Sequence, residues 1–310
     1  MSLASARMAA LAGLLLAAVA ATARAAPEDV CQAAKASHDD RIAGCSAIIE
    51  AGRSKGHDLA IAYCNRGHAF TEKRDFERAL ADLEQAIQID PKYACAYSNR
   101  GRVRALQRDL ERAIADYDQA IKLDAKFALA FNNRGDAWRQ KGDLERAIAD
   151  FSEAIRIDPK SALAYGNRGF AWSTKGNLDR AIADYSQVIR LTPDDLLAYI
   201  NRGNAWRAKE ELDRAAADYG EVIRLAPGDA RGWRNRGLVR LFKNELAGGI
   251  ADYDQAIKLE PSDAYSWNNR GQAKMRKGDR EGAIADFKKA LELRPDLRQV
   301  QEILRELGAP

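Results

Sequence analysis

The tripeptide Asn-Arg-Gly recurs along the sequence at a constant interval of 34 residues, and this period constrains the fold more than any other feature. It occurs seven times without an insertion or deletion between copies. A fixed period of this size is typical of a solenoid, in which one supersecondary unit stacks on copies of itself. When Ala60 is counted as position 1 of the unit, the asparagine falls at position 6. The seven asparagines are Asn65, Asn99, Asn133, Asn167, Asn201, Asn235 and Asn269.

The small and large apolar residues of the unit predict two packed helices. Position 8 is always Gly, and position 20 is Ala in six copies and Gly249 in the other. Because Gly inside a helix costs about 1 kcal/mol relative to Ala, we expect position 8 to lie in close contact with position 20 of the second helix. Larger apolar residues recur at spacings of three, four and seven, and Pro at position 32 ends the second helix in six copies. The tryptophans fit this core pattern better than a ligand-binding box.

The unit resembles the tetratricopeptide repeat in having an aromatic residue at positions 4, 11 and 24, Gly at 8, Ala at 20 and Pro at 32. This resemblance implies an all-α fold, a right-handed superhelical solenoid of seven helix-turn-helix repeats whose first helices line a concave face. In repeat two, Arg108 and Ala125 replace the turn Gly and the final Pro, so we expect its second helix to run on. Repeat six, with Arg240 and Gly249, is expected to be the softest. The repeats are 60–93, 94–127, 128–161, 162–195, 196–229, 230–263 and 264–297.

The segments before and after the repeats have their own predicted roles. Residues 1–25 contain Arg7, an apolar run over Met8–Ala21 and small residues around Arg24, which predicts a signal peptide. The run is shorter than the roughly 20 residues of a membrane-spanning helix, although a retained anchor is the alternative. We therefore expect an exported bacterial protein, periplasmic or secreted. Residues 26–59 are interpreted as a degenerate leading repeat that covers the N-terminal end, and 298–310 as a capping helix.

Charge and motif content argue against several classes of protein. The 49 basic and 45 acidic residues leave a net charge of +4, which is too small to indicate a nucleic-acid-binding protein. The sequence has no Gly-rich phosphate loop, no nucleophile elbow and no metal-ligand spacing among its histidines. Because repeats and flanking segments account for the sequence, we expect no catalytic site, no cofactor and no metal. The chain is predicted not to be an enzyme.

Two pairs of cysteines are candidates for disulfides in an oxidising compartment. Cys31 and Cys45 fall at positions 6 and 20 of the leading repeat, on facing helices. Cys64 and Cys95 fall on neighbouring first helices. Four cysteines allow three pairings, and the sequence does not choose among them.

An invariant pair of opposite charges accompanies the core pattern. Position 7 is always Arg and position 23 is always Asp. A partly buried Arg requires a hydrogen-bonded partner, so we predict a repeated ion pair that fixes the stacking of the repeats, with a ligand-binding role as the alternative. The arginines are Arg66, Arg100, Arg134, Arg168, Arg202, Arg236 and Arg270, and the aspartates are Asp82, Asp116, Asp150, Asp184, Asp218, Asp252 and Asp286.

The asparagines at position 6 suggest a binding surface. They resemble the asparagine ladder of the repeat domain of O-linked sugar transferases, which binds the backbone of an extended peptide. An amide side chain can donate to a peptide carbonyl and accept from a peptide N–H. The alternative is that each Asn bonds within its own helix. The resemblance implies that the ladder binds a polypeptide in the concave groove.

Side-chain preference in the groove is expected from positions 2, 5, 9, 12 and 13. The basic residues there are Arg102, Arg139, Arg207, Arg231, Arg234 and Arg276, and the apolar ones include Leu163, Phe170, Leu197, Ile200, Leu238, Leu241 and Phe242. They predict an extended partner with acidic and apolar side chains. We therefore expect a non-catalytic scaffold or adaptor that binds protein or peptide, with no nucleic acid and no membrane span in the mature chain. The alternative is a self-assembling repeat protein whose groove holds another copy.

Overall fold

The computed structural model describes residues 27–33 and 35–309, and these contain seventeen helices and no strand. The predicted signal segment, residues 1–25, lies outside the described residues. The described residues divide into two compact units, one up to residue 125 and one from residue 126. The all-helical repeat fold predicted from the 34-residue period is confirmed.

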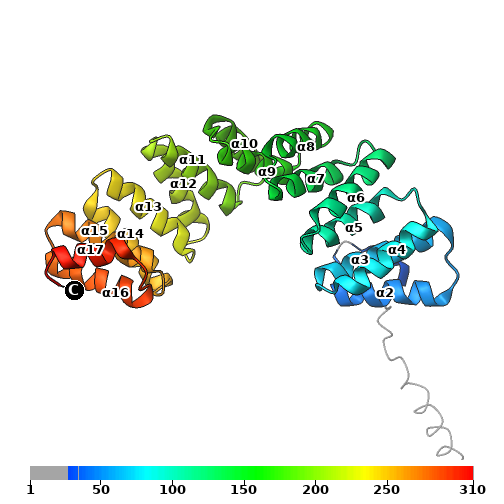
Figure 1. The fold of residues 1–310 in the computed structure, drawn as a ribbon, viewed down its shortest axis with the longest axis horizontal. Coiled ribbons are helices and arrows are strands. Elements are labelled where there is room, and N and C mark those ends of the chain that lie inside the picture. The colour runs from blue at the N-terminus through cyan, green and yellow to red at the C-terminus, as the bar shows by residue number, and fades with distance from the viewer. Residues whose placement is uncertain (1–26, 34, 310) are drawn as a thin grey trace, which may run out of the picture. The chain divides into compact units, whose positions relative to one another are not determined.

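The described part of the first unit contains six helices, coloured blue to green in Figure 1. A short helix, α1, and a longer one, α2, precede two full repeats, and the two helices of each repeat pack against each other. The helices are α1 (Pro27–Gln32), α2 (His38–Ala51), α3 (Gly56–Glu72), α4 (Phe76–Ile89), α5 (Ala94–Leu106) and α6 (Leu110–Leu123).

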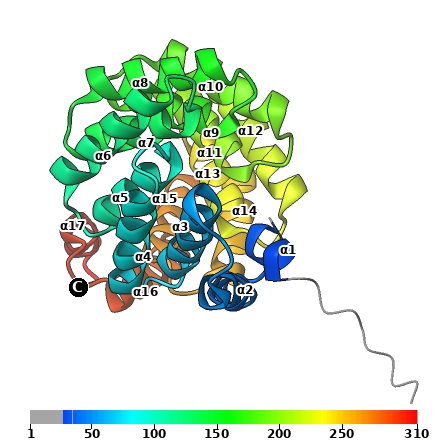
Figure 2. The ribbon, with the colours of Figure 1, turned by 90° about the vertical axis from the view of Figure 1, so that its right-hand side faces the viewer.

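The second unit contains five helix pairs followed by one further helix, and the pairs can be followed in Figures 1 and 2. Each second helix also packs against the first helix of the next pair, so the pairs stack in chain order. The helices are α7 (Ala128–Gln140), α8 (Leu144–Ile157), α9 (Ala162–Thr174), α10 (Leu178–Leu191), α11 (Leu196–Ala208), α12 (Leu212–Leu225), α13 (Ala230–Phe242), α14 (Leu246–Leu259), α15 (Ala264–Lys277), α16 (Arg280–Leu293) and α17 (Arg298–Glu306).

A left-handed residue at position 15 separates the two helices of every repeat. It is Gly142, Gly176 or Gly278 in three repeats, with φ between 79° and 92°. In the other four repeats a non-Gly residue adopts the same conformation, with φ between 59° and 67°. These residues are Arg74, Arg108, Glu210 and Asn244. The turn geometry is therefore set by the packing of the helices, which imposes a backbone conformation that L residues rarely adopt.

Five of the seven second helices begin with a side-chain cap. Asp75, Asp109, Asp143 and Asp279 each accept a hydrogen bond from the backbone N–H three residues further on, and Asn177 does the same. A capping carboxylate or amide satisfies one of the N–H groups that the first helical turn leaves without a partner. Position 16 therefore stabilises the start of these five helices, whereas Glu211 and Glu245 at the same position make no capping hydrogen bond.

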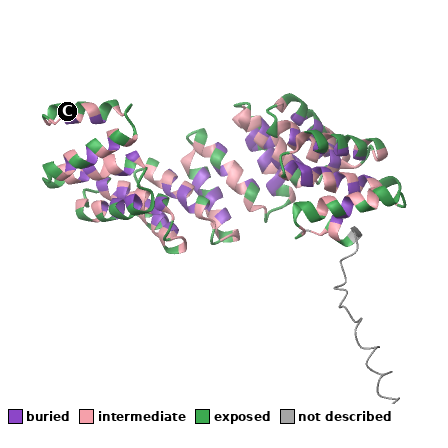
Figure 3. Ribbon diagram, turned by 90° about the horizontal axis from the view of Figure 1, so that it is seen from below, coloured by how far each residue is buried: buried purple, intermediate pink, exposed green. Residues whose placement is uncertain are grey.

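The glycine at position 8 lies against the large side chain at position 24, which is an aromatic ring in six of the seven repeats, and this differs from our expectation. A Cβ atom on Gly203 would lie 2.8 Å from Cε1 of Tyr219, and one on Gly101 would lie 2.8 Å from Cε1 of Tyr117. The position-20 residue contributes its carbonyl oxygen, at 3.0 Å in the case of Ala113, rather than its side chain. The glycine is required because a buried large residue fills this space. Figure 3 shows such buried residues where paired helices face each other.

Two further details differ from the sequence-based expectation. The second helix of repeat two ends at Leu123, with Asp124 as an extended C-cap, so the prediction that it runs on was wrong. In the leading segment α2 begins at His38, four residues earlier than the 34-residue register places a second helix. At the other end, Val300 and Leu304 of α17 pack against Ala283 and Phe287 of α16 and thereby cover an apolar face.

Candidate functional site

The invariant Arg and Asp are brought together in all seven repeats. Each guanidinium binds the carboxylate of its own repeat, with closest N–O distances between 2.6 and 2.8 Å. The aspartates are buried and the arginines are mostly buried. For example, the hydrogen bond to Asp184 raises the pKa of Arg168, which keeps the guanidinium charged. The pair joins the first helix of each repeat to the second.

Several of these arginines also reach the second helix of the preceding repeat. Nη1 of Arg168 donates to Ser152 Oγ at 3.1 Å, and Nη1 of Arg202 donates to Ser186 Oγ at 3.0 Å. Arg270 binds Asp254 in the same way at 2.6 Å. These contacts cross from one repeat to the next, as a role in fixing the stacking requires. That role stays a prediction.

The position-6 asparagines are all half-buried, and most of them bond within the chain. Nδ2 of Asn65 donates to the Cys31 carbonyl at 3.3 Å, and Nδ2 of Asn167 donates to Asn132 Oδ1 at 3.0 Å. Asn99 donates to the sulfur of Cys64. Asn133 and Asn269 each accept a hydrogen bond from the preceding asparagine, at 3.4 and 3.1 Å.

Asn201 and Asn235 differ from the other members of the ladder. Within the described residues neither side chain makes a hydrogen bond. Their amides therefore keep both donor and acceptor capacity for a ligand. The amides of Asn65, Asn99 and Asn167 are partly used in joining neighbouring first helices, and those of Asn133 and Asn269 bond within their own helix.

Four of the six predicted groove arginines are already paired with carboxylates. Arg102 binds Glu72, Arg139 binds Asp136, Arg231 binds Asp229 and Arg234 binds Asp263, with N–O distances between 2.6 and 3.1 Å. Nη1 of Arg276 donates to the Leu241 carbonyl at 3.2 Å. Arg207 is half-buried beside Tyr219. The local positive charge is therefore smaller than the arginine positions suggest.

The predicted apolar groove residues fall into two groups. Leu163, Phe170, Leu197 and Phe242 are exposed, with fractions between 46% and 57%. Ile200 and Leu241 are buried, with fractions of 6% and 3%, so they belong to the core and their assignment to the groove was wrong. Leu238 is half-buried.

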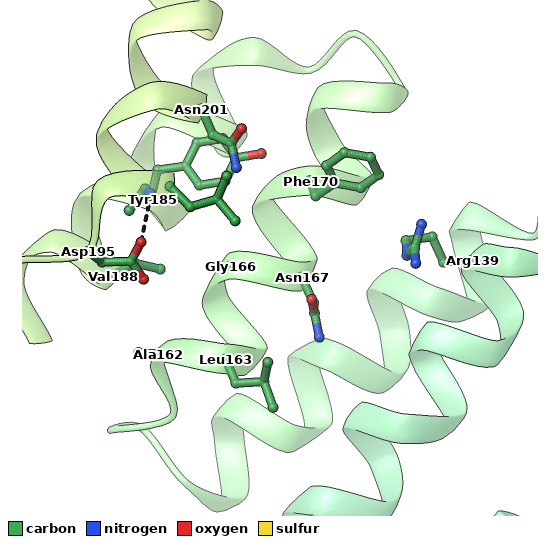
Figure 4. A pocket seen from close by; sticks show the side chains of 12 residues that line it. Arg139, Ala162, Leu163, Gly166, Asn167, Phe170, Tyr185, Val188, Asp195 and Asn201 are labelled. Carbon is green, nitrogen blue, oxygen red and sulfur yellow. Dashed lines mark hydrogen bonds between the residues drawn. The ribbon is translucent and has the colours of Figure 1, made fainter. Parts of the chain in front are cut away.

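The exposed leucines and Phe170 border a pocket of about 510 Å³ in the second unit (Figure 4). Three first helices, α7, α9 and α11, line it together with α10. Asn167 and Asn201 of the ladder both face it, and Leu163, Leu197 and Phe170 form its apolar rim. Most ligand sites combine a largely apolar lining with a few polar groups in this way.

Gly166 opens this pocket. It occupies position 5, where the other repeats carry Cys, Ser, Asn, Ile or Arg. A Cβ atom on Gly166 would meet only Val188, at 3.8 Å, so the space that a side chain would fill is empty. The second-helix residues Tyr185 and Val188 consequently line the pocket although both are almost entirely buried.

The polar groups of the pocket lie at its ends and at its base. Arg139, whose guanidinium carbon is 5.3 Å from the centre of the Phe170 ring, lies at one end, and Asp195 lies at the other (Figure 4). Asp195 accepts from the backbone N–H of Ala198 and so caps α11. Burial raises the pKa of Tyr185, so its hydroxyl is neutral and can donate. Among the described residues that hydroxyl has no hydrogen-bond partner.

Cys31 and Cys45 are joined by a disulfide, with their Cα atoms 4.8 Å apart, whereas Cys64 and Cys95 are free thiols. The bond ties α1 to α2. The two cysteines meet although α2 starts early, so the register that suggested the pair does not describe this segment.

Family profiles match much of the chain. One described as "Tetratricopeptide repeat" matches residues 99–162 and 174–230, and a second with the same description matches 60–93 and 264–297. A third, described as "TPR repeat", matches 243–278. The chain belongs to the tetratricopeptide-repeat family. Proteins of this family are generally non-catalytic scaffolds with protein or peptide partners.

Solved structures of tetratricopeptide-repeat proteins resemble this one. The structure of YrrB, described as "a TPR protein with an unusual peptide-binding site", has a TM-score of 0.53 and 20% identity and covers 61% of this chain and 97% of that one. A structure of MamA has a TM-score of 0.50 and 27% identity and covers 53% and 96%. The C-terminal part of a TPR repeat-containing protein from Cytophaga hutchinsonii has a TM-score of 0.64 and 18% identity and covers 77% and 98%. No curated protein shows significant similarity to this chain.

Some features of this tetratricopeptide-repeat chain were missed by reasoning from the sequence. Leu129 and Tyr265 are exposed at position 2, like Leu163 and Leu197, and the shared position is the signal that could have identified them. Gly166 could have been found as the single glycine at position 5. Within residues 27–33 and 35–309, no helix is both long enough and hydrophobic enough to cross a membrane.

Proposed function

We propose that this chain is a non-catalytic interaction scaffold that binds an extended polypeptide segment across the pocket between α7, α9 and α11. The observation that carries the proposal is the combination of an exposed apolar rim with unpartnered polar groups. Leu163, Leu197 and Phe170 offer apolar surface, while Asn201 and the Tyr185 hydroxyl have hydrogen-bonding capacity that the described residues do not use.

These groups suit a peptide better than a small apolar molecule. The amide of Asn201 can bind both a peptide carbonyl and a peptide N–H, and thus recognises backbone without demanding a particular sequence. The space at Gly166 accepts one large apolar side chain of the segment. An acidic residue of the segment can then face Arg139, at one end of the pocket, away from Asp195. YrrB, described as having a peptide-binding site, supports the same class of ligand.

Binding to an array of synthetic extended peptides, in which apolar and acidic positions are varied independently, tests this proposal. We expect peptides with one large apolar residue near an acidic one to bind best, and their affinity to fall with added salt. An array without apolar preference would contradict the proposal. An apolar preference with no acidic bias would remove only the contact with Arg139.

Three variants locate the site of the strongest peptide. Gly166→Leu should weaken binding about tenfold or more, because a leucine side chain fills the space at no cost to the helix. Leu197→Ser should also weaken it. The matched control is Leu259→Ser on α14, an exposed leucine outside the pocket, which should leave affinity unchanged. Full affinity in Gly166→Leu would place the peptide elsewhere.

The alternative of self-assembly is tested on the same preparation. Sedimentation of the unliganded chain at increasing concentration should give a constant mass if the pocket is reserved for a partner. A mass that rises with concentration, and falls when the peptide is added, would assign the pocket to a second copy.

We also propose that the chain is exported. The N-terminal charge and hydrophobicity pattern supports this, and the Cys31–Cys45 disulfide is the kind of bond that persists in an oxidising compartment. N-terminal sequencing of the protein recovered after cell fractionation should begin at Ala26. An intact N-terminus in the membrane fraction would instead support the retained anchor, and one in the cytosol would contradict export.

A further inference from the structure

The two free cysteines of the first unit share one hydrogen-bond donor. Cys64 lies on α3 and Cys95 on α5, the first helices of successive repeats, which pack against each other. Nδ2 of Asn99 lies 3.2 Å from the Cys64 sulfur and 3.7 Å from the Cys95 sulfur. Both thiols therefore lie next to the same amide group.

The two thiols differ in accessibility. Cys64 is completely buried, whereas Cys95 is only partly buried at the edge of the same apolar cluster, which also contains Tyr93. A reagent from solution can reach Cys95 first.

The two thiols also differ in acidity, in the same sense. The hydrogen bond from the Cys64 thiol lowers the pKa of Cys95 to about 7, against the effect of burial, and Tyr93 adds to this. The same hydrogen bond, together with burial, raises the pKa of Cys64. At neutral pH a substantial share of Cys95 is thiolate, the nucleophilic form, while Cys64 stays protonated.

We propose that Cys64 and Cys95 form a redox-active pair, in which Cys95 attacks a low-molecular-weight disulfide and Cys64 then closes a disulfide between α3 and α5. This site is independent of the pocket in the second unit. The hydrogen bonds that Cys95 accepts stabilise its thiolate, and the neighbouring buried thiol is positioned as the resolving group, as in other pairs of this kind.

The reaction balances in two exchange steps. The Cys95 thiolate attacks one sulfur of the external disulfide, the external S–S bond breaks and one thiolate leaves. Cys64 loses its proton to the departing thiolate and attacks the Cys95 sulfur, and the second external thiolate leaves and takes up the proton that Cys95 had released. The two cysteines lose two electrons and two protons together, and the external disulfide is reduced to two thiols.

The product would connect the first helices of repeats one and two covalently. Residues 64 and 95 enclose the whole of α4 and its turns, so the bond would restrict the unfolded chain and stabilise the first unit. Oxidation should therefore raise the temperature at which this unit unfolds. The change would leave the peptide pocket and its affinity unaltered.

Peptide mapping after incubation of the full chain with oxidised glutathione tests the proposal. Trypsin places Cys64 in the peptide 56–66 and Cys95 in the peptide 93–100, apart from both cysteines of the structural disulfide. We expect the linked pair 56–66/93–100 to accumulate with two hydrogens lost. Glutathione retained on Cys95 without the link, or no reaction of either thiol, would overturn the proposal.

Single variants separate the two roles. Cys64→Ser should stop at a stable glutathione adduct on Cys95, and Cys95→Ser should leave Cys64 unmodified over the same period. The Ala versions of both variants repeat the experiment in case a buried serine disturbs folding, which circular dichroism monitors. Modification of Cys64 in Cys95→Ala at the wild-type rate would overturn the order of attack. Alkylation of wild-type Cys95 should be half-maximal near its pKa of about 7, rather than near that of an ordinary thiol.

Discussion

Repeats three to five and repeats two, six and seven use the same position for opposite kinds of side chain. Position 11 is Trp138, Trp172 or Trp206 in the first group and Arg104, Arg240 or Lys274 in the second. In the first group an arginine at position 19 stacks on the tryptophan, with distances to the ring centre between 3.6 and 4.6 Å. In the second group the position-11 cation binds the buried Asp of its own repeat, at 2.7 to 2.9 Å.

The comparison shows that the buried carboxylate at position 23 binds one cation in some repeats and two in others. Asp252 accepts from Arg236 and from Arg240, both at 2.8 Å, whereas Asp184 accepts from Arg168 and from no position-11 side chain. In repeats six and seven the stacking arginine is also replaced by glycine. A Cβ atom on Gly248 would lie 3.2 Å from Cδ of Arg240, so the long cation occupies the space that the ring and its stacked arginine fill elsewhere. The two helices of a repeat can thus be held together either by an arginine that stacks on a tryptophan or by a second cation that binds the buried carboxylate.

The largest expected effect comes from removing the carboxylate that serves two cations. Asp252→Ala leaves Arg236 and Arg240 without their acceptor in a mostly buried place, which should cost about 3–4 kcal/mol. Asp184→Ala should cost about 1 kcal/mol less, because one guanidinium loses its partner. Hydrogen exchange within α13 and α14, compared with α9 and α10, measures both. Equal losses would show that the second cation adds nothing.

The next effect concerns the glycine at position 8. Gly203→Ala places a Cβ atom 2.8 Å from the Tyr219 ring and should cost about 2 kcal/mol, whereas in repeat six the contacts of Gly237→Ala begin at 3.2 Å. We expect the second substitution to cost about half as much. Thermal unfolding followed by circular dichroism ranks the two variants. A larger loss for Gly237→Ala would mean that the distance between the added Cβ atom and the ring does not set the cost of the substitution.

The stacked arginine should contribute less than the buried pair. Arg180→Ala removes the guanidinium whose carbon lies 4.5 Å from the centre of the Trp172 ring, at an expected cost of about 0.5–1 kcal/mol. Arg112→Ala is the matched control, since this exposed arginine holds the same position in repeat two but, among the described residues, forms an ion pair only with Asp109. Its cost should stay below about 0.5 kcal/mol. If Arg112→Ala costs as much stability as Arg180→Ala, stacking on the tryptophan does not account for the loss.

The smallest expected effect is an increase in stability. Gly249→Ala adds a Cβ atom whose nearest neighbour is 3.4 Å away, so the better helix propensity of alanine should stabilise α14 by about 0.5–1 kcal/mol. Gly220→Ala on α12, where nothing lies within 4 Å, is the control and should give the same gain. Hydrogen exchange in α14 that is slower in Gly249→Ala than in the wild type would show that Gly249 destabilises this helix. That result would support the prediction that repeat six is the least stable repeat. Destabilisation by Gly249→Ala, with a gain at Gly220, would show that the helices of repeat six need the glycine.

Periodicity predicted the helix pairs well because each repeat must bury the same stripe against its neighbours. It failed where the outcome depends on a particular neighbour. Ile200 and Leu241 fall at positions assigned to the groove, yet both are buried. Ile200 belongs to a core cluster that includes Val222 and Ile189 of the adjacent second helices. The cations Arg104 and Lys274 were missed because an aromatic residue was expected at position 11. The pocket could not be predicted, since Gly166 leaves space beside Tyr185 only if no other side chain fills it.

The pocket beside Gly166 arises from the loss of a side chain, and this has a consequence for how such arrays acquire new partners. Because the repeat length stays unchanged, a single codon change at the corresponding position of another repeat can create or abolish a recognition site without disturbing the scaffold. Specificity can then evolve, or be engineered, one repeat at a time.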